Sequence, residues 1–175
     1  MNTTGIVRRI DELGRVVIPK EIRKTMRIKE GEELEVCVSG EDALLLRKYS
    51  PVKSTEKLGA DYVEILSKNT SCACFLCDTD EITASYGDKN YPVGAKISKA
   101  TIEFIEKRKS AVLRKSEAFA VLPAAEKTDT AIAPVVVNGD AVGALVFVSK
   151  TAMPSADKCL KLLEVGASFF AKQLE

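Results

Sequence analysis

Three closely spaced cysteines are the residues of this chain whose types and spacing most clearly suggest reactive or metal-binding chemistry. Cys72, Cys74 and Cys77 form the spacing C-x-C-x-x-C, which occurs in zinc and iron–sulfur sites. The chain contains no histidine, so a fourth ligand would have to be Cys159 or Asp78. On a strand, Cys72 and Cys74 face one way and Cys77 the other, which is a poor geometry for one tetrahedral metal. We expect buried, apolar thiols and no metal site, with redox sensing by the same thiols as the alternative.

The lack of histidine also limits the enzymatic chemistry that is open to the chain. It excludes Ser-His and Cys-His nucleophilic pairs and a histidine general base. Carboxylate or lysine chemistry stays open, but no pair of acids stands in an apolar segment. We therefore expect no enzymatic activity, no catalytic residue and no cofactor.

The basic residues of the chain are unevenly distributed. The net charge is only +1, from 26 basic and 25 acidic residues. Residues 1–29, however, contain eight basic and three acidic residues, whereas residues 30–46 contain six acids and no base. A contact with a polyanion is therefore expected near the N-terminus.

The termini and the cysteine count bear on the compartment. The first residues lack the charged and apolar regions of a signal peptide, and no apolar run approaches the roughly 20 residues that span a bilayer. Five cysteines, an odd number, suit a reducing compartment better than a secreted disulfide framework. We expect a cytoplasmic, nucleoid-associated protein with no membrane partner.

The first fifty residues must position the N-terminal cations on short elements. Alternation of apolar and polar residues predicts four strands, at 4–10, 15–18, 34–38 and 43–49. A turn at 11–14 joins the first two, with one of its acids orienting Arg15, and Pro19 opens a helix between the pairs. Because so short a region with exposed strand edges buries little surface, we expect it to dimerise.

Four basic residues share one face of the predicted helix. They stand at i, i+3, i+4 and i+7: Lys20, Arg23, Lys24 and Arg27. Such a stripe is usually only a solvated face, but Arg8, Arg9 and Arg15 on the neighbouring strands extend it, and a two-fold axis doubles it. We therefore predict a surface that binds DNA phosphates. Residues 4–25 contain no asparagine or glutamine for adenine edges, so we expect A·T-rich or deformable targets that are read mainly through shape.

The segment TGIVRRIDELGRVVIPKEIRKT, residues 4–25, resembles the N-terminal domain of AbrB-type transition-state regulators. The resemblance implies a swapped-hairpin barrel, in which two chains interleave their strands and present arginines to DNA. It also implies the DNA-contact positions: Arg8, Arg9, Arg15, Arg23 and Lys24. Close relatives often have arginine where Lys24 stands, so this position is expected to offer a point charge in place of a bidentate contact.

Residues 51–55 have the composition of a linker and separate an N-terminal domain, residues 1–50, from a second domain, residues 56–175. In the second domain, helices are predicted around 58–66, at 98–109 and at 155–174. Strands are predicted at 72–77, 81–85, 118–122, 130–137 and 142–149, with a hairpin turn at Asn138-Gly139-Asp140. The last helix has an apolar face wide enough for the sheet and a partner helix, and packing within the domain alone is the alternative.

This order of elements resembles a GAF domain, and the whole chain resembles the stage V sporulation protein T family. The resemblance implies an α+β chain, in which an AbrB-like swapped-hairpin β-barrel formed by two chains is followed by a GAF-like α/β sensor domain. GAF domains commonly bind a small molecule, so an effector is implied, with its identity and its binding residues unknown. The loop from Tyr86 to Pro92 would cover such a pocket, and an ordinary strand-to-helix connection is the alternative.

These observations together predict a sequence-tolerant DNA-binding transcriptional regulator of sporulation or growth-transition genes. Its expected partners are double-stranded DNA and a second copy of the chain through the N-terminal domain. The family resemblance adds a homotetramer through the helices around 58–66 and 160–174. The alternative is an antitoxin-type interaction module with autoregulatory DNA binding, because antitoxins of addiction systems share the N-terminal fold. They usually follow that fold with a short segment, whereas about 125 residues of globular pattern follow it here.

Overall fold

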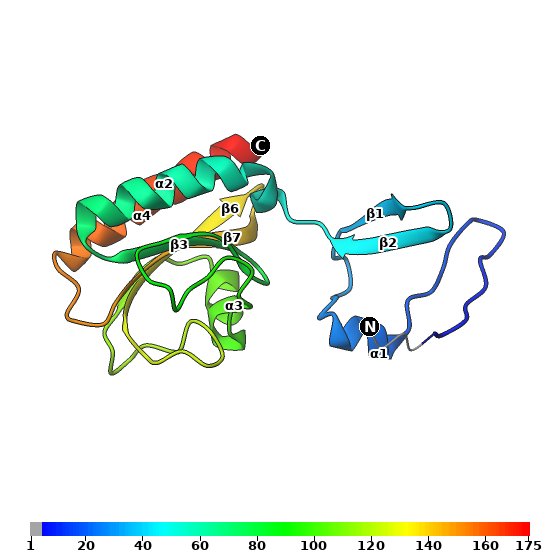
Figure 1. The fold of residues 1–175 in the computed structure, drawn as a ribbon, viewed down its shortest axis with the longest axis horizontal. Helices are drawn as coiled ribbons and strands as arrows, with labels where there is room; N and C mark the ends of the chain where they lie inside the picture. Colours follow the sequence, from blue (N-terminus) through cyan, green and yellow to red (C-terminus); the bar gives the residue numbers. More distant parts are fainter. Residues whose placement is uncertain (1–4) are drawn as a thin grey trace. The chain divides into compact units, whose positions relative to one another are not determined.

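The computed structural model describes residues 5–175, and the chain separates into two units, Met1–Tyr49 and Ser50–Glu175 (Figure 1). The described part of the N-terminal unit contains α1 (Lys20–Thr25), β1 (Leu34–Ser39) and β2 (Ala43–Lys48). The elements of the C-terminal unit are, in chain order, η1 (Pro51–Thr55), α2 (Glu56–Thr70), β3 (Ala73–Asp78), β4 (Ile82–Tyr86), α3 (Lys99–Glu106), β5 (Ala111–Leu113), β6 (Asp129–Val137), β7 (Asp140–Ser149) and α4 (Ala156–Leu174). Within residues 5–175, no helix combines the length and the apolar character that a membrane crossing requires.

The N-terminal unit is only partly organised as a single chain. The hairpin predicted after the helix is confirmed, since β1 and β2 pair antiparallel with Val36 opposite Leu46. The strands predicted at 4–10 and 15–18 are absent: Thr4 lies outside the described residues, and residues 5–10 and 15–18 have no ladder partner. A strand is defined by its pairing with a neighbour, and within the described residues only one backbone–backbone hydrogen bond, from the Asp11 amide to the Arg15 carbonyl at 3.1 Å, links the two segments.

This unit also lacks a core of its own. Among its described residues only Pro19 is buried. Val7 is 90% exposed, Val38 77% and Leu13 74%. Apolar side chains at this density on a soluble surface indicate a contact face for another chain.

The C-terminal unit is built on one antiparallel sheet with the strand order β4-β3-β7-β6-β5. Helices α2 and α4 cover one face of the sheet and α3 covers the other (Figure 1). Because side chains alternate along a strand, β7 serves two cores: Leu145 and Phe147 pack toward α2 and α4, while Val146 and Val148 pack toward α3. The sheet is thus the common wall of two apolar layers.

Two glycines of this unit are required by the backbone, one in a hairpin turn and one at the contact between α4 and the sheet. The predicted hairpin turn is confirmed between β6 and β7, where Asn138 and Gly139 both have positive φ values, 50° and 91°. This pair of left-handed residues gives the twist that an antiparallel hairpin requires. Gly166 of α4 lies against the sheet, and a Cβ there would stand 2.6 Å from Leu145 Cδ1. The contact between α4 and the sheet therefore depends on the missing side chain.

The strand predicted at 118–122 is wrong. Ala118, Val121 and Leu122 are buried, but they lie in a loop, and the edge strand β5 comes earlier, at Ala111–Leu113. The Val121 carbonyl accepts hydrogen bonds from the Ser98 amide at 2.8 Å and from Thr101 Oγ1 at 2.9 Å, which ties the loop to the start of α3. The apolar spacing in this segment thus reflects a loop that packs under a helix.

Candidate functional site

The basic residues predicted to contact DNA lie on two short segments of the N-terminal unit. Arg8 and Arg9 belong to the extended segment before the 11–14 turn, Arg15 follows that turn, and Arg23 and Lys24 stand in the last turn of α1. All five side chains are exposed. The structure therefore presents them to solvent from one small unit, as a phosphate-binding surface requires.

The cationic stripe of α1 is shorter than predicted. The helix ends at Thr25, and Arg27 adopts a left-handed conformation with φ 54°. The Ile28 amide donates to the Arg23 carbonyl at 2.8 Å and the Arg27 amide to the Lys24 carbonyl at 3.2 Å. These two hydrogen bonds cap the last carbonyls of the helix. Arg27 therefore leaves the stripe, and only Lys20, Arg23 and Lys24 share the helix face.

An acidic residue in the turn orients Arg15, as predicted. Asp11 Oδ2 accepts a hydrogen bond from Arg15 Nε at 2.7 Å, while Asp11 Oδ1 accepts from the amides of Leu13 and Arg15 at 3.0 and 2.8 Å. The hydrogen bonds from the Arg15 amide and guanidinium lower the pKa of Asp11. The carboxylate engages the Nε edge of Arg15, so the outer edge of the guanidinium faces solvent and can meet a phosphate.

The acids of the hairpin pair with hairpin bases. Arg47 Nη2 lies 3.2 Å from Glu35 Oε2, and Lys48 Nζ lies 2.9 Å from Glu32 Oε1. Within the described residues, no ion pair joins an acid to four of the five predicted contact residues: Arg8, Arg9, Arg23 and Lys24. The described acids of the hairpin therefore leave these four side chains without a direct carboxylate partner.

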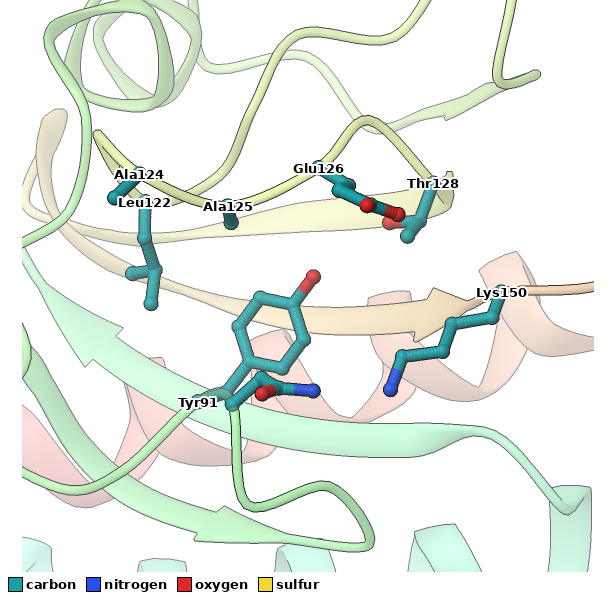
Figure 2. Close-up of a pocket in the computed structure, with 8 residues that line it drawn as sticks. Tyr91, Leu122, Ala124, Ala125, Glu126, Thr128 and Lys150 are labelled. Atoms are coloured by element: carbon teal, nitrogen blue, oxygen red, sulfur yellow. The ribbon is translucent and has the colours of Figure 1, made fainter.

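The C-terminal unit contains a cavity of about 500 Å³ beside the end of β7 (Figure 2). Tyr91, Leu122 and Thr128 form its buried part, and Glu126 and Lys150 stand at its exposed rim. Tyr91 belongs to the loop that was predicted to cover a pocket. Glu126 and Lys150 carried no sequence signal, because each is an ordinary charged residue beside a strand end.

The three clustered cysteines are buried. Cys72 and Cys74 lie in the core on the α2 and α4 side and Cys77 lies in the core on the α3 side, as predicted from their spacing. Burial raises the pKa of the Cys72 thiol to about 11 and that of Cys77 to about 12, so both are protonated near neutral pH. Within residues 5–175, no three side chains of the metal-binding types gather at one point. These thiols act as packing groups.

Relatives of this chain align with it from end to end. The family model described as "Stage V sporulation protein T C-terminal, transcription factor" matches residues 55–175, and "Antidote-toxin recognition MazE, bacterial antitoxin" matches residues 7–54. Stage V sporulation protein T of Bacillus subtilis (strain 168) is 36% identical over 179 residues, which cover 100% of this chain and 99% of that protein. The transition state regulatory protein AbrB of the same organism is 49% identical over 59 residues, 34% of this chain and 60% of AbrB.

Solved structures of GAF domains resemble this chain in fold. The GAF domain of an Acinetobacter phosphoenolpyruvate-protein phosphotransferase has a TM-score of 0.58 at 15% identity, over 73% of this chain and 83% of that domain. The cofactor-binding GAF domain of the nutrient sensor CodY from Clostridium difficile has a TM-score of 0.52 at 13% identity, over 89% of this chain and 94% of that domain. The C-terminal unit therefore has the GAF fold, preceded by an AbrB-like domain. With one family model matching most of the chain and a relative 36% identical along its full length, the chain belongs to the stage V sporulation protein T family of transcription factors.

Proposed function

We propose that two copies of the chain join through residues 1–49 into one DNA-binding surface, with Arg8, Arg9, Arg15, Arg23 and Lys24 as the phosphate contacts. The protein would regulate sporulation or growth-transition genes, as a cytoplasmic, nucleoid-associated regulator without enzymatic activity. The observation that carries this proposal is that the N-terminal unit exposes both apolar and basic side chains. Within the described residues, most of its apolar side chains are exposed, and no ion pair joins an acid to Arg8, Arg9, Arg23 or Lys24.

The apolar exposure supports an obligate dimer. Both faces of the β1–β2 hairpin carry exposed apolar side chains, with Val38 and Leu44 on one face and Leu45 on the other. The unpaired segments 5–10 and 15–18 supply further apolar residues and free main-chain groups. Interleaving two chains satisfies both at once, since strands of one copy find partners in the other and the apolar faces close on each other.

The charge supports sequence-tolerant binding. Two copies bring ten cationic side chains to one surface, and each phosphate that they neutralise releases counterions. Phosphate contacts position a protein on the duplex without reading the bases. We therefore propose that selection among sites depends mainly on DNA shape and deformability, with loosely palindromic sites favoured by the two-fold axis.

The GAF-fold unit adds two further roles to this proposal. Its helices α2 and α4 expose apolar side chains that are suited to pairing dimers into a homotetramer: Leu58, Ile65, Leu162, Val165 and Phe169. Its cavity offers a place for a small molecule that changes DNA affinity, since GAF domains of sensors such as CodY are described as cofactor-binding. The domain limits 1–50, 51–55 and 56–175 are part of the same proposal.

An antitoxin-type interaction module is the second candidate, and the match of an antitoxin model to residues 7–54 favours it. That match ends where the GAF-fold unit begins, and the end-to-end relative is a sporulation protein. This candidate predicts that a dedicated toxin partner binds to the chain with a defined stoichiometry, in addition to autoregulatory DNA binding.

Titration of DNA against the protein at several salt concentrations tests the proposal. If all ten cations of a dimer contact phosphates, the slope of log K against log salt approaches about −9. Arg8→Ala and Arg23→Ala should each weaken binding to all sequences and flatten that slope by about 2, because each removes two contacts per dimer. Lys57→Ala on exposed α2 is the matched control and should leave the slope unchanged. Equal slopes for all variants would overturn the proposal.

A further inference from the structure

The cavity of the GAF-fold unit has a polar end and an apolar end. Figure 2 shows Leu122, Ala124 and Ala125 at one end and Glu126, Thr128 and Lys150 at the other, with the Tyr91 ring between them. Its volume of about 500 Å³ is within the range of small-molecule sites and exceeds what one or two waters fill. A ligand that suits this cavity is therefore small and amphipathic.

One buried polar group in the cavity lacks a partner. Thr128 is only 5% exposed, and its Oγ1 makes no hydrogen bond within the described residues. Burial raises the pKa of Tyr91, and the nearby Thr128 hydroxyl acts in the opposite direction, although the two hydroxyls fall short of hydrogen-bond geometry. A buried hydroxyl without a partner is unfavourable, so this one indicates that a further hydrogen-bonding group belongs in the cavity.

The charges at the polar end define what that group is. Lys150 Nζ lies 2.9 Å from Asp88 Oδ2, and this pair is close to electrically neutral. Glu126 acts electrostatically on Lys150 and Tyr91, and no acid–base pair within the described residues neutralises it. The polar end thus offers one excess negative charge beside a cation and two hydroxyls. An ammonium group meets Glu126, while a carboxylate meets Lys150 and the hydroxyls of Thr128 and Tyr91.

Other ligand classes fit these groups less well. A phosphate brings negative charge and no cation, so the unpaired carboxylate of Glu126 beside the neutral Lys150–Asp88 pair repels it. A simple amine would leave the Thr128 hydroxyl unpaired, and a simple carboxylate would leave Glu126 unneutralised. An uncharged apolar molecule would pair with neither group.

We propose that this cavity binds a zwitterionic α-amino acid with a small apolar side chain, which lies against Leu122, Ala124 and Ala125. The assignment rests on the proposed function in one respect, that the GAF-fold unit senses a small molecule. It adds the chemical class of the effector and the residues that recognise it. Recognition divides between Glu126 for the ammonium group and Lys150 with Thr128 for the carboxylate.

Calorimetric titration of the full-length protein tests this assignment. The probes are L-valine, L-leucine and L-methionine, each up to about 10 mM, together with isoamylamine and 4-methylpentanoate, which keep the leucine side chain but lack one charge. Saturable binding of at least one amino acid is expected, with isoamylamine and 4-methylpentanoate at least about tenfold weaker than L-leucine when L-leucine binds. Failure of all three amino acids to bind overturns the proposal. Binding of isoamylamine or 4-methylpentanoate as tightly as L-leucine overturns it as well.

Three variants locate the binding to these residues. Glu126→Gln and Thr128→Val keep the shapes of their side chains and should each weaken the amino acid at least about tenfold. Thr128→Val should also melt at or above the wild-type temperature, because it removes an unpaired buried hydroxyl. Lys127→Gln alters an exposed neighbour outside the cavity lining and should bind as the wild type does. If Glu126→Gln and Lys127→Gln bind alike, the assignment of the ammonium site is refuted.

DNA titration of the same preparations separates this inference from the proposed function. If DNA binds with the expected salt slope but no amino acid binds, the assignment of the cavity fails and DNA binding stands. If an amino acid binds at the cavity but DNA affinity does not change, the cavity is correctly assigned and regulation by it fails.

Discussion

Asp129 is the residue whose replacement tests the packing around the cavity most sharply. It is 7% exposed at the start of β6, directly after Thr128. Its carboxylate accepts from the Lys115 amide at 2.8 Å, the Met153 amide at 3.0 Å and Arg114 Nη1 at 3.0 Å. One side chain therefore ties the 114–128 loop and the β7–α4 connection to the edge of the sheet.

The expected cost of Asp129→Asn follows from these three bonds. A charge-assisted bond from a buried amide is worth about 1.5–3 kcal/mol, and an asparagine retains one of the two as a weaker neutral bond. The bond from Arg114 adds at most about 1 kcal/mol, because the arginine side chain is half exposed. We expect a loss of about 3 kcal/mol in the free energy of unfolding. With a dependence of the unfolding free energy on urea of about 2 kcal/mol/M, this loss lowers the urea midpoint by about 1.5 M.

Tyrosine fluorescence during urea unfolding is a suitable assay. The chain has no tryptophan, and three of its four tyrosines lie in the C-terminal unit: Tyr62, Tyr86 and Tyr91. Asp140→Asn is the matched control, since the Asp140 side chain is 87% exposed at a hairpin turn and should change the midpoint little. A midpoint for Asp129→Asn within about 0.3 M of the control would refute the reasoning.

The pH dependence of the same comparison provides an independent check. Backbone hydrogen bonds from Met153 and Lys115 hold the pKa of Asp129 below its ordinary value of 3.8. A carboxylate whose pKa is lowered by folding stabilises the fold above its ordinary value and loses that effect as the pH falls through the folded value. The difference between wild type and Asp129→Asn should therefore be full at pH 7 and shrink below about pH 4. A difference that stays constant to lower pH would show that the charge of Asp129 is not what the fold uses.

Three other substitutions test separate parts of the molecule. Asp11→Asn removes the carboxylate that holds Arg15 Nε, so it should raise DNA affinity at low salt and leave the Arg15 side chain less fixed on the phosphate. An unchanged affinity and salt slope would contradict that role of Asp11. Val165→Asp places a charge on the exposed apolar face of α4 and should convert a tetramer into dimers by native mass spectrometry, whereas an unaltered assembly would exclude that face. Gly166→Ala forces a Cβ to within 2.6 Å of Leu145 Cδ1 and should lower the unfolding free energy by about 1–3 kcal/mol, and an unchanged melting temperature would show that the two layers can separate freely.

The predictions that depended on local chemistry agreed with the structure. The Asn138-Gly139 turn requires two left-handed residues, and few other pairs supply them, so the hairpin could be predicted from two letters of sequence. The helix predicted at 98–109 is present as α3, and the structure adds that the Ser98 Oγ caps it by accepting from the Thr101 amide at 3.2 Å. Features that depend on one side chain and its neighbouring backbone can be predicted without knowledge of the fold.

The predictions that failed depended on partners distant in sequence. The apolar spacing of residues 118–122 predicted a strand, but the Val121 carbonyl in this segment accepts from Ser98 and Thr101 and not from a neighbouring strand. The strands at 4–10 and 15–18 need neighbours that the single chain does not provide. The cavity gathers Tyr91, Glu126 and Lys150 from three separate segments, and no spacing rule connects them. These features depend on tertiary contacts, which the apolar periodicity of the sequence does not predict.

An ion network connects the cavity loop with the segment that enters the GAF-fold unit. Lys96 ends the loop that contains Tyr91, and its Nζ lies 2.9 Å from Glu81 Oε2. Glu81 Oε1 in turn lies 2.6 Å from Lys53 Nζ, and Lys53 belongs to η1, which follows directly on the N-terminal unit. Hydrogen bonds from Lys53 and Lys96 overcome the desolvation of Glu81 and lower its pKa, so the carboxylate stays charged near neutral pH.

If the amino acid proposed above shifts the Tyr91 loop, these two ion pairs are the contacts through which the shift would reach η1. Such coupling is reciprocal, because an effector that changes DNA affinity by some factor must have its own affinity changed by the same factor when DNA binds. Amino-acid affinity measured with and without DNA should then differ as much as DNA affinity does with and without the amino acid. A factor of one in both measurements would mean that the cavity and the DNA-binding surface are not coupled.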